Sequence, residues 1–459
     1  MVQINLTEIM DMKKLNKILL LTSTVLAFAS PVLAMGVESG PMPVVSDLKV
    51  KLSAYGHFQA GFVNQNHRSG SEKNVSANRD SFAFFSDAAL FADVSNTADD
   101  IGLTYGAKIV LVPTAKRKGG PSYNGSHIYM ESEFGRVEAG SPIVASSNMS
   151  VDASAISSAT GGDWDRYAKF NTNFLKQDTS FEPSFATFAE FFLDSKLVTD
   201  TQTRKYSNEP SRSISYYTPK FEFGQASKVQ VGVSFTPDSA NTGADNPGAN
   251  SSGVDRKDIK TTSAAGVVVE QYFKLDKSVK NAVSGGVVLE QNISDGVDVK
   301  LALTGETAKS AGKAQLFNTT DTDGKTPLAN YKLKDLRTYN IGSVLNFGSF
   351  SAAASYGSLG KSLTTPEVQK TGQNTVYYTG GLAYKQGPFS ASVTYFRSNQ
   401  YKNVLDCVTV GTDYKLAPGF KPYAEISGFS LKGKPEFFPD LKAKKTRGTI
   451  ALIGAKLSL

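Results

Sequence analysis

Cysteine and histidine are scarce in this chain of 459 residues, which has one cysteine, Cys407, and three histidines. A single cysteine excludes a disulfide within the chain and a zinc site built from cysteines. Three histidines leave little material for a histidine-rich metal centre. The sequence therefore predicts no catalytic residue, no metal site and no cofactor.

Long apolar runs are also missing. A membrane-spanning helix needs about 20 consecutive apolar residues, and the most apolar segment, residues 18–29, is shorter than that. A helical membrane protein is therefore excluded. Intrinsic disorder is disfavoured by 28 Phe, 19 Tyr and 1 Trp, because unfolded polar chains contain few aromatic residues. Together with 40 glycines, the aromatic residues favour a chain of many β-strands.

The N-terminus has the order of parts found in a secretory signal peptide. A basic stretch precedes the apolar run 18–29, and the small residue Ala34 follows it. This pattern predicts a signal peptide at 1–34, in which 1–11 is an extension before a second start at Met12. A buried N-terminal helix is the alternative. Removing 1–34 deletes three lysines and two acids, so the net charge of +7 falls by one. The predicted signal leaves 35–459 as an exported domain.

Alternation of apolar and polar residues with a period of two runs through most of the chain after residue 46. Such alternation is typical of strands with one apolar face and one polar face in contact with water. The segments are about 9–14 residues long, which suits strands that cross a bilayer at a tilt. Aromatic residues near the segment ends suit an interfacial girdle. The first strand shows the pattern most clearly: its apolar face carries Val50, Leu52, Ala54, Gly56, Phe58, Ala60 and Phe62.

Short turns alternate with long polar connections, as in outer-membrane barrels. We predict an all-β fold: a transmembrane antiparallel β-barrel of 16 strands, or 18 if the strand-like segment 261–274 adds a hairpin to the wall. A barrel of this size encloses a water-filled lumen. The predicted strands are 49–63, 81–94, 101–112, 126–134, 136–141, 212–220, 229–236, 281–292, 297–309, 333–347, 350–360, 375–386, 389–398, 404–416, 420–431 and 447–459. The long connections are 64–80, 113–125, 142–211, 237–280, 310–331, 361–374 and 432–446.

Four stretches, in the expected order, resemble the Gram-negative general porins, especially the alphaproteobacterial ones. Residues 134–142 (FGRVEAGSP) are similar to the signature before the constriction loop, and 213–219 (SISYYTP) with 231–237 (VGVSFTP) to the unit after it. Residues 413–419 (DYKLAPG) resemble the last periplasmic turn, and 448–459 the closing strand. The chain ends in Leu459, where these porins usually end in Phe.

The resemblance implies that 142–211 folds into the lumen as a constriction loop, and that 237–280 is a long extracellular loop. Opposed charges across such a constriction set ion preference. The alternative is that these charges are simply solvated. Strand parity points Lys108, Arg136 and Glu138 into the lumen. The full set of constriction candidates is Asp152, Asp163, Asp165 and Arg166 on the loop, Arg79 at a strand mouth, and Lys108, Arg136 and Glu138 on the wall.

The predicted function is a porin of the cell outer membrane that passes small hydrophilic solutes and ions by passive diffusion. The expected partners are two further copies in a homotrimer, outer-membrane lipid and lipopolysaccharide, and no nucleic acid. An adhesin or surface antigen that acts through the long loops is the alternative. A barrel phospholipase ranks last, because His67 and Ser69 share a polar loop rather than a strand face. A soluble secreted β-protein is a fourth possibility.

Overall fold

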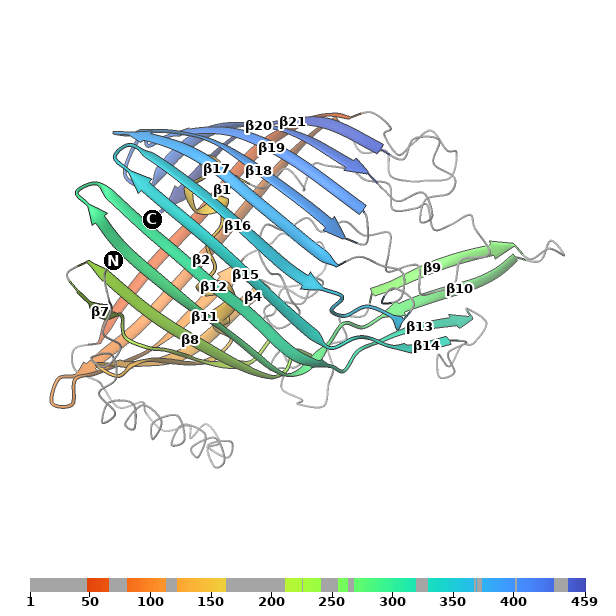
Figure 1. Ribbon diagram of the computed structural model, residues 1–459, viewed down its shortest axis with the longest axis horizontal. Helices are drawn as coiled ribbons and strands as arrows, with labels where there is room; N and C mark the ends of the chain where they lie inside the picture. The colour runs from red at the N-terminus through yellow and green to blue at the C-terminus, as the bar shows by residue number, and fades with distance from the viewer. Residues whose placement is uncertain are drawn as a thin grey trace, which may run out of the picture. The chain divides into compact units, whose positions relative to one another are not determined.

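A closed antiparallel barrel forms the body of the chain in the computed structural model (Figure 1). In the described part of the chain, sixteen strands make up its wall, as predicted, and no helix is long and apolar enough to cross a bilayer. The structure describes residues 48–65, 81–112, 122–161, 211–224, 226–240, 255–262, 268–318, 329–366, 369, 374–400, 403–432 and 445–459.

Each strand of the wall pairs with the next one along the chain, and β1 pairs with β21 to close the ring. At the seam, the backbones of Ala54 and Leu459 exchange two hydrogen bonds of 2.8 and 2.9 Å. A short piece, β7 (Phe221–Phe223), follows β6 against β8. The wall strands are β1 (Lys49–Gln65), β2 (Phe82–Ala98), β3 (Leu103–Val112), β4 (Ser122–Ser132), β5 (Gly135–Gly140), β6 (Ser213–Tyr217), β8 (Ser227–Asp238), β11 (Val279–Ser294), β12 (Val297–Ser310), β15 (Leu336–Phe347), β16 (Phe350–Gly360), β17 (Thr375–Gln386), β18 (Phe389–Gln400), β19 (Asn403–Tyr414), β20 (Phe420–Lys432) and β21 (Lys445–Ser458).

Four further strands form a second sheet instead of widening the wall to 18 strands. β10 (Val268–Leu275) pairs with β9 (Asp255–Thr262) and with β13 (Lys313–Asn318), which pairs with β14 (Ala329–Lys332). β10 runs directly into β11 after 276–278, so it prolongs a wall strand rather than adding a new one. The connections predicted at 237–280 and 310–331 therefore contain strands of their own.

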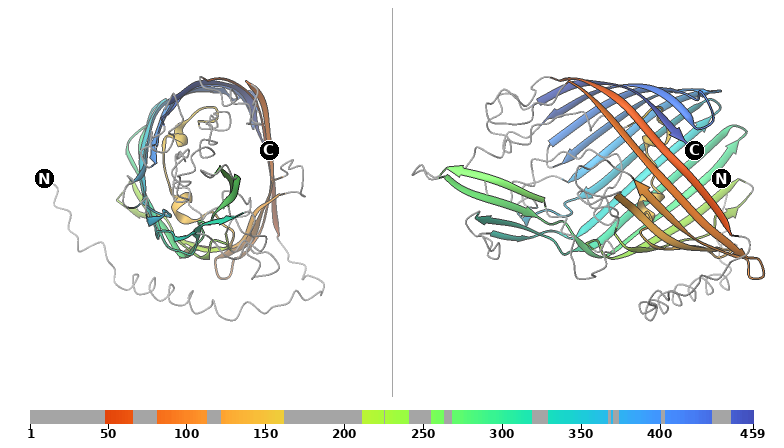
Figure 2. Two further views of the ribbon diagram at one scale, coloured as in Figure 1. Left: turned by 90° about the vertical axis from the view of Figure 1, so that its right-hand side faces the viewer. Right: turned by 180° about the vertical axis from the view of Figure 1, so that it is seen from behind.

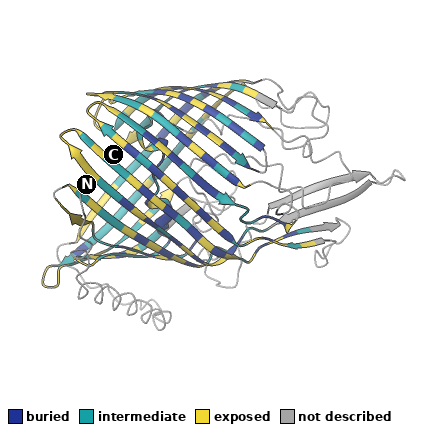
Figure 3. Ribbon diagram, in the orientation of Figure 1, coloured by how far each residue is buried: buried dark blue, intermediate teal, exposed yellow. Residues whose placement is uncertain are grey.

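Buried and exposed residues alternate along the strands of the wall, as the period of two predicted (Figure 3). On β1, the side chain of Phe58 is 51% exposed on the outer face, while Gln59 is 0% exposed on the inner face. Outward aromatic rings form rows along neighbouring strands. One row, Phe347, Phe350 and Tyr384, lies beside the short turns, and another, Tyr339, Tyr356 and Tyr378, lies towards the other end. Such rows are typical of the aromatic girdles of membrane barrels.

The short turns gather at one end of the barrel, the end that also holds the β1–β21 seam near Leu459. Gly296 and Gly348 occupy positive φ angles of 77° and 61° in two of these turns, a conformation that costs glycine little. The turn between the strands predicted at 81–94 and 101–112 lies later in the chain than those bounds imply. Pairing between β2 and β3 continues to Ala98 and Leu103, and the turn follows at 99–102.

Candidate pore constriction

The segment after β5 enters the barrel and crosses its inner wall. It contains α2 (Ala145–Asn148) and η3 (Ala153–Ile156), and Figure 2 (left) shows both inside the ring of strands. α2 contacts β6, β8, β11 and β12, while η3 contacts β15 to β18. We call residues 142–161 the inner loop track. This track confirms the predicted inward fold for the described part of the loop 142–211.

Backbone N–H groups of the inner loop track donate to side chains of the wall along its length. Such bonds satisfy buried donors that have no ladder partner. They are made to three different strands, so they fix the path of the track rather than one point of it. The pairs are Ala145 to Ser234 Oγ (2.7 Å), Ala153 to Thr379 Oγ1 (3.1 Å) and Ser158 to Ser392 Oγ (2.7 Å).

Charged side chains hold the far end of the track. The carboxylate of Glu425 on β20 accepts from Thr160 N (2.9 Å), Thr160 Oγ1 (2.8 Å) and Gly161 N (2.9 Å). Glu425 is only 2% exposed, so its charge depends on these donors for solvation. On the flanking strands, Asp413 Oδ2 accepts from Ala159 N (3.1 Å) and Lys456 Nζ donates to Ala159 O (2.5 Å).

Glycines on the inner face make room for the track. A Cβ added at Gly342 on β15 would lie 1.8 Å from the carbonyl oxygen of Val151, far inside van der Waals contact. Similar close approaches occur on β8, β11, β17 and β19. The glycines concerned are Gly232 and Gly286 against Met149, Gly381 against Ala153, and Gly411 against Ser158 and Ala159.

Apolar side chains complete the seat of the track. Met149 and Val151 of the track belong to one buried cluster with inward-facing wall residues, which include Val288 on β11 and Val344 on β15. Apolar side chains on the inner face of a water-filled barrel need such cover. The track is therefore bound by hydrogen bonds, charge and apolar burial together.

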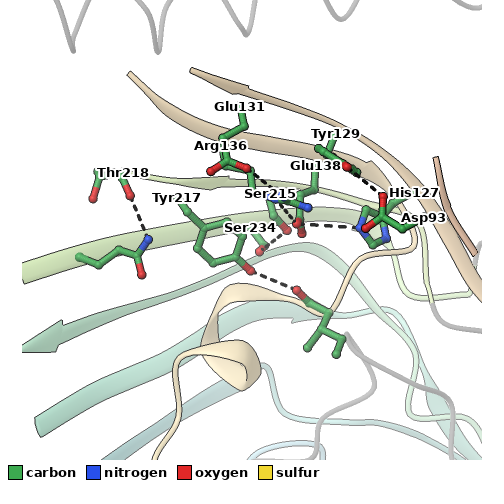
Figure 4. Close-up of polar contacts among 12 residues, drawn as sticks. Asp93, His127, Tyr129, Glu131, Arg136, Glu138, Ser215, Tyr217, Thr218 and Ser234 are labelled. Atoms are coloured by element: carbon green, nitrogen blue, oxygen red, sulfur yellow. Dashed lines mark hydrogen bonds and ion pairs between the residues drawn. The ribbon is translucent and has the colours of Figure 1, made fainter. Parts of the chain in front are cut away.

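Across the lumen surface of β2 to β5, a cluster of charged and aromatic side chains surrounds Arg136 (Figure 4). Its guanidinium donates to Glu138 Oε1 at 2.7 Å and to Glu131 Oε2 at 2.9 Å. It also lies 4.0 Å from the centre of the Tyr129 ring, a cation–π arrangement. The Tyr129 hydroxyl in turn donates to Asp93 at 2.9 Å. Cations and anions thus alternate on this part of the wall.

A cavity of about 570 Å³ lies between this charged cluster and α2. Asn148 and Met149 of the track form one side of it, and charged side chains of β4, β5, β11 and β12 form others. One further ion-pair group borders it: Lys220 Nζ lies 2.6 Å and Lys300 Nζ 3.5 Å from the Glu290 carboxylate. The cavity is polar enough to hold water and hydrated ions.

The predicted constriction residues divide into three groups. Lys108, Arg136 and Glu138 face the lumen. Lys108 lies opposite Asp93 on β2 and His127 on β4 in the strand register, and Arg136 and Glu138 lie in the cluster of Figure 4. Asp152 lies on the track but is only 2% exposed, and its carboxylate accepts from Ser154 N at 2.8 Å as the cap of η3. The four that lie outside the described residues are Arg79, Asp163, Asp165 and Arg166.

Sequence reasoning missed the residues that hold the track. Glu425, Asp413 and Lys456 face inward by the same parity that selected Lys108. Parity alone, however, does not say which inward residues contact the loop. These three residues are more than 250 positions away in the chain from the loop residues that they bind. The inward glycines could have predicted where the loop lies against the wall, since an inward glycine in a strand often marks a close backbone approach.

A closed barrel with an apolar outer face, a polar inner face and a loop across its lumen defines a membrane channel of the β-barrel class. Residues 22–434 match the family model described as Gram-negative porin. The chain therefore belongs to the Gram-negative porin family, as its motifs predicted, and is a channel protein of the outer membrane.

Relatives with similar sequences occur in Rickettsia. An uncharacterized protein of Rickettsia felis is 40% identical over 452 residues, covering 96% of this chain and 99% of the relative. One from Rickettsia typhi is also 40% identical, with the same coverage. Solved structures share less sequence. A porin refined at 1.8 Å and an anion-selective porin from Comamonas acidovorans each have a TM-score of 0.48, at 15% and 14% identity, covering 90% of this chain and all of theirs.

Proposed function

We propose that the protein lets small hydrophilic solutes and ions diffuse passively across the outer membrane. The observation that carries the proposal is the inner loop track, which narrows a lumen whose facing wall bears Lys108, Arg136 and Glu138. Fixed charges at a narrowing favour one sign of ion, and the narrow width itself excludes large solutes. No covalent chemistry is needed for this function.

Three further parts belong to the same proposal. Residues 1–34 act as the export signal, supported by their basic and apolar order. The channel is a homotrimer, as expected for a general porin. Lysines 442, 444 and 445 in the last long connection meet anionic lipopolysaccharide, since basic clusters attract anionic membrane surfaces.

The purified protein in a planar lipid bilayer tests the function. We expect stepwise increases of current in multiples of three equal units, because each inserted trimer adds three lumens at once. The steps require only salt on both sides, with no energy source. Silent bilayers, obtained with protein that has retained its barrel by circular dichroism, would contradict the proposal.

Ion selectivity tests the constriction residues. Arg136→Gln removes a positive charge from the lumen wall, and Glu138→Gln removes a negative one. A unit charge about 4 Å from an ion in water is worth about 1 kcal/mol, which is roughly fivefold in a permeability ratio. We expect the reversal potential in a salt gradient to shift towards cation preference for Arg136→Gln and towards anion preference for Glu138→Gln.

The control for selectivity is an ion pair on the outer face. Arg397 NH1 lies 3.1 Å from Asp406 Oδ1 there, and neither residue faces the lumen. Arg397→Gln should therefore leave the reversal potential unchanged. Equal shifts for Arg397→Gln and Arg136→Gln would remove Arg136 from the constriction. We place Asp163, Asp165 and Arg166 on the loop side of the same constriction and Arg79 at a strand mouth beside the wall residues, and their charge-removing variants enter the same assay.

A further inference from the structure

Two groups of charged side chains border the cavity between the Arg136 cluster and α2. In the described part of the chain, its lining includes three carboxylates and three cationic side chains. The two signs are not evenly mixed. One group lies on β4 and β5, and the other lies on β11, β12 and the connection after β6. The charge within each group decides what the cavity can bind.

The group on β4 and β5 has an excess of negative charge. A single cation, the guanidinium of Arg136, donates to Glu138 at 2.7 Å and to Glu131 at 2.9 Å. Two carboxylates against one cation leave one negative charge over. The side chain of Glu131 is 53% exposed, whereas that of Glu138 is 13% exposed. Glu131 is therefore the carboxylate that a positively charged ligand group can reach.

The group on β11 and β12 has an excess of positive charge. Lys220 Nζ lies 2.6 Å and Lys300 Nζ 3.5 Å from the same carboxylate, that of Glu290. The Lys300 distance is longer than the usual hydrogen bond of about 2.7–3.2 Å, and its side chain is 45% exposed. Its N–H groups can therefore donate to a ligand carboxylate. The nearby Lys228 adds no net charge, because it pairs with Glu222 at 2.7 Å.

The spacing of the two groups follows from the strand order. β5 pairs with β6, β6 with β8, and β8 with β11. Neighbouring strands lie about 4.8 Å apart, so β5 and β11 are about 14 Å apart across the strands. An extended peptide spans at most about 3.3–3.6 Å per residue. A single amino acid is thus too short to reach both groups, whereas about four residues span the distance.

The lining between the two groups suits a peptide backbone. Asn148 of α2 and Gln230 of β8 contribute amides, and Met149 and Val288 contribute apolar surface. The amide of Gln230 is held in place, since its Nε2 donates to Thr218 O at 3.0 Å. The volume of about 570 Å³ lies within the range of small-molecule pockets, about 300–1,000 Å³.

We infer that this cavity binds short zwitterionic peptides of about four residues. The amino end lies at Glu131 and the carboxyl end at Lys300. A simple anion or cation is attracted by one group and repelled by the other, whereas a zwitterion of this length is attracted by both. The inference rests on the proposed diffusion function, because the cavity then serves as a binding step on the path of the solute.

A titration of tetraglycine against the folded barrel in detergent, followed by saturation-transfer NMR, tests the inference. At about pH 7 both peptide ends are charged, and the imidazole of His127 beside Glu138 is mostly neutral. We expect tetraglycine to bind about fivefold more tightly than N-acetyl-tetraglycine or tetraglycine amide, the effect of one unit-charge contact at about 4 Å in water. Glycine should also bind more weakly, since it reaches one group at a time.

Two variants assign the peptide ends. Lys300→Gln should weaken tetraglycine about fivefold and leave tetraglycine amide unchanged, because the amide has no carboxylate to lose a partner. Glu131→Gln should weaken tetraglycine and leave N-acetyl-tetraglycine unchanged. The matched control is Lys385→Gln, since Lys385 faces inward on β17 but does not line the cavity. It should leave all affinities unchanged.

Three results would overturn the inference. They are equal binding of tetraglycine and its two capped forms, binding of glycine as tight as that of tetraglycine, and equal losses from Lys300→Gln and Lys385→Gln. The titration needs no ion current. Conduction without peptide binding would therefore refute this inference alone, and silent bilayers with intact peptide binding would refute the proposed function alone.

Discussion

Replacing Glu425 with alanine is expected to release the far end of the inner loop track and to make the channel current unsteady. Glu425 accepts from Thr160 N, Thr160 Oγ1 and Gly161 N. A hydrogen bond to a charged group is worth about 1.5–3 kcal/mol. Loss of one such bond alone raises the population of detached track ends by roughly tenfold or more.

Single-channel recording at constant voltage measures this release as a wider spread of the open-channel current. Glu425→Gln keeps an acceptor but loses the charge, so its spread should lie between those of the wild type and Glu425→Ala. Asp406→Asn is the matched control, because Asp406 is a carboxylate on the neighbouring strand that bonds Tyr395 and Arg397 on the outer face. Steady current from Glu425→Ala, with the barrel intact, would show that Glu425 does not hold the track.

Replacing Gly342 with alanine is expected to push the track off its seat. The new Cβ would lie 1.8 Å from Val151 O and 2.8 Å from its carbonyl carbon. Carbon contacts are favourable near 3.5–4.0 Å, so Val151 must move by about 1.5 Å or more. Overpacking of this kind costs about 1–3 kcal/mol. We expect a lower unfolding midpoint in denaturant and a changed single-channel conductance.

The sign of the stability change distinguishes a clash with the track from the effect of alanine on the strand itself. Glycine in a strand interior is usually less stable than alanine by about 0.5–1 kcal/mol. Gly428 on β20 faces outward, and a Cβ there would meet no atom within 4 Å. Gly428→Ala should therefore be neutral or stabilising and leave the conductance unchanged. If Gly342→Ala behaves like Gly428→Ala, the track does not rest on Gly342.

The wall could be predicted from the sequence because the alternation within each strand shows which residues face lipid and which face the lumen. On β1, alternate residues face lipid and lumen, so the outward Phe58 and the inward Gln59 are read from parity alone. The same parity places Lys108 beside Asp93 on the inner face. The turn after β2 was misplaced because the polar residues 96–98 are equally suited to a strand end and to a turn. Segment 261–274 left 16 or 18 strands open, since a pattern of period two does not say which sheet a strand joins.

The constriction could be predicted only in part. Its loop was found through the motif at 134–142 and the length of the following connection, but its path depends on contacts between distant parts of the chain. Ser158 meets Ser392, and Thr160 meets Glu425, across more than 230 positions. Asp152 was selected for its charge, whereas its carboxylate caps η3. Local sequence carries the type of a side chain but not the partner that the fold brings to it.

Single-channel conductance of the wild type beside a chain in which residues 145–210 are replaced by a short Gly-Ser linker tests the central claim most directly. The claim is that this barrel is an open channel narrowed from within by its own loop. It predicts discrete steps for the wild type and larger steps for the shortened chain, with both barrels folded. Silent bilayers, or steps of equal size from the two chains, would contradict it.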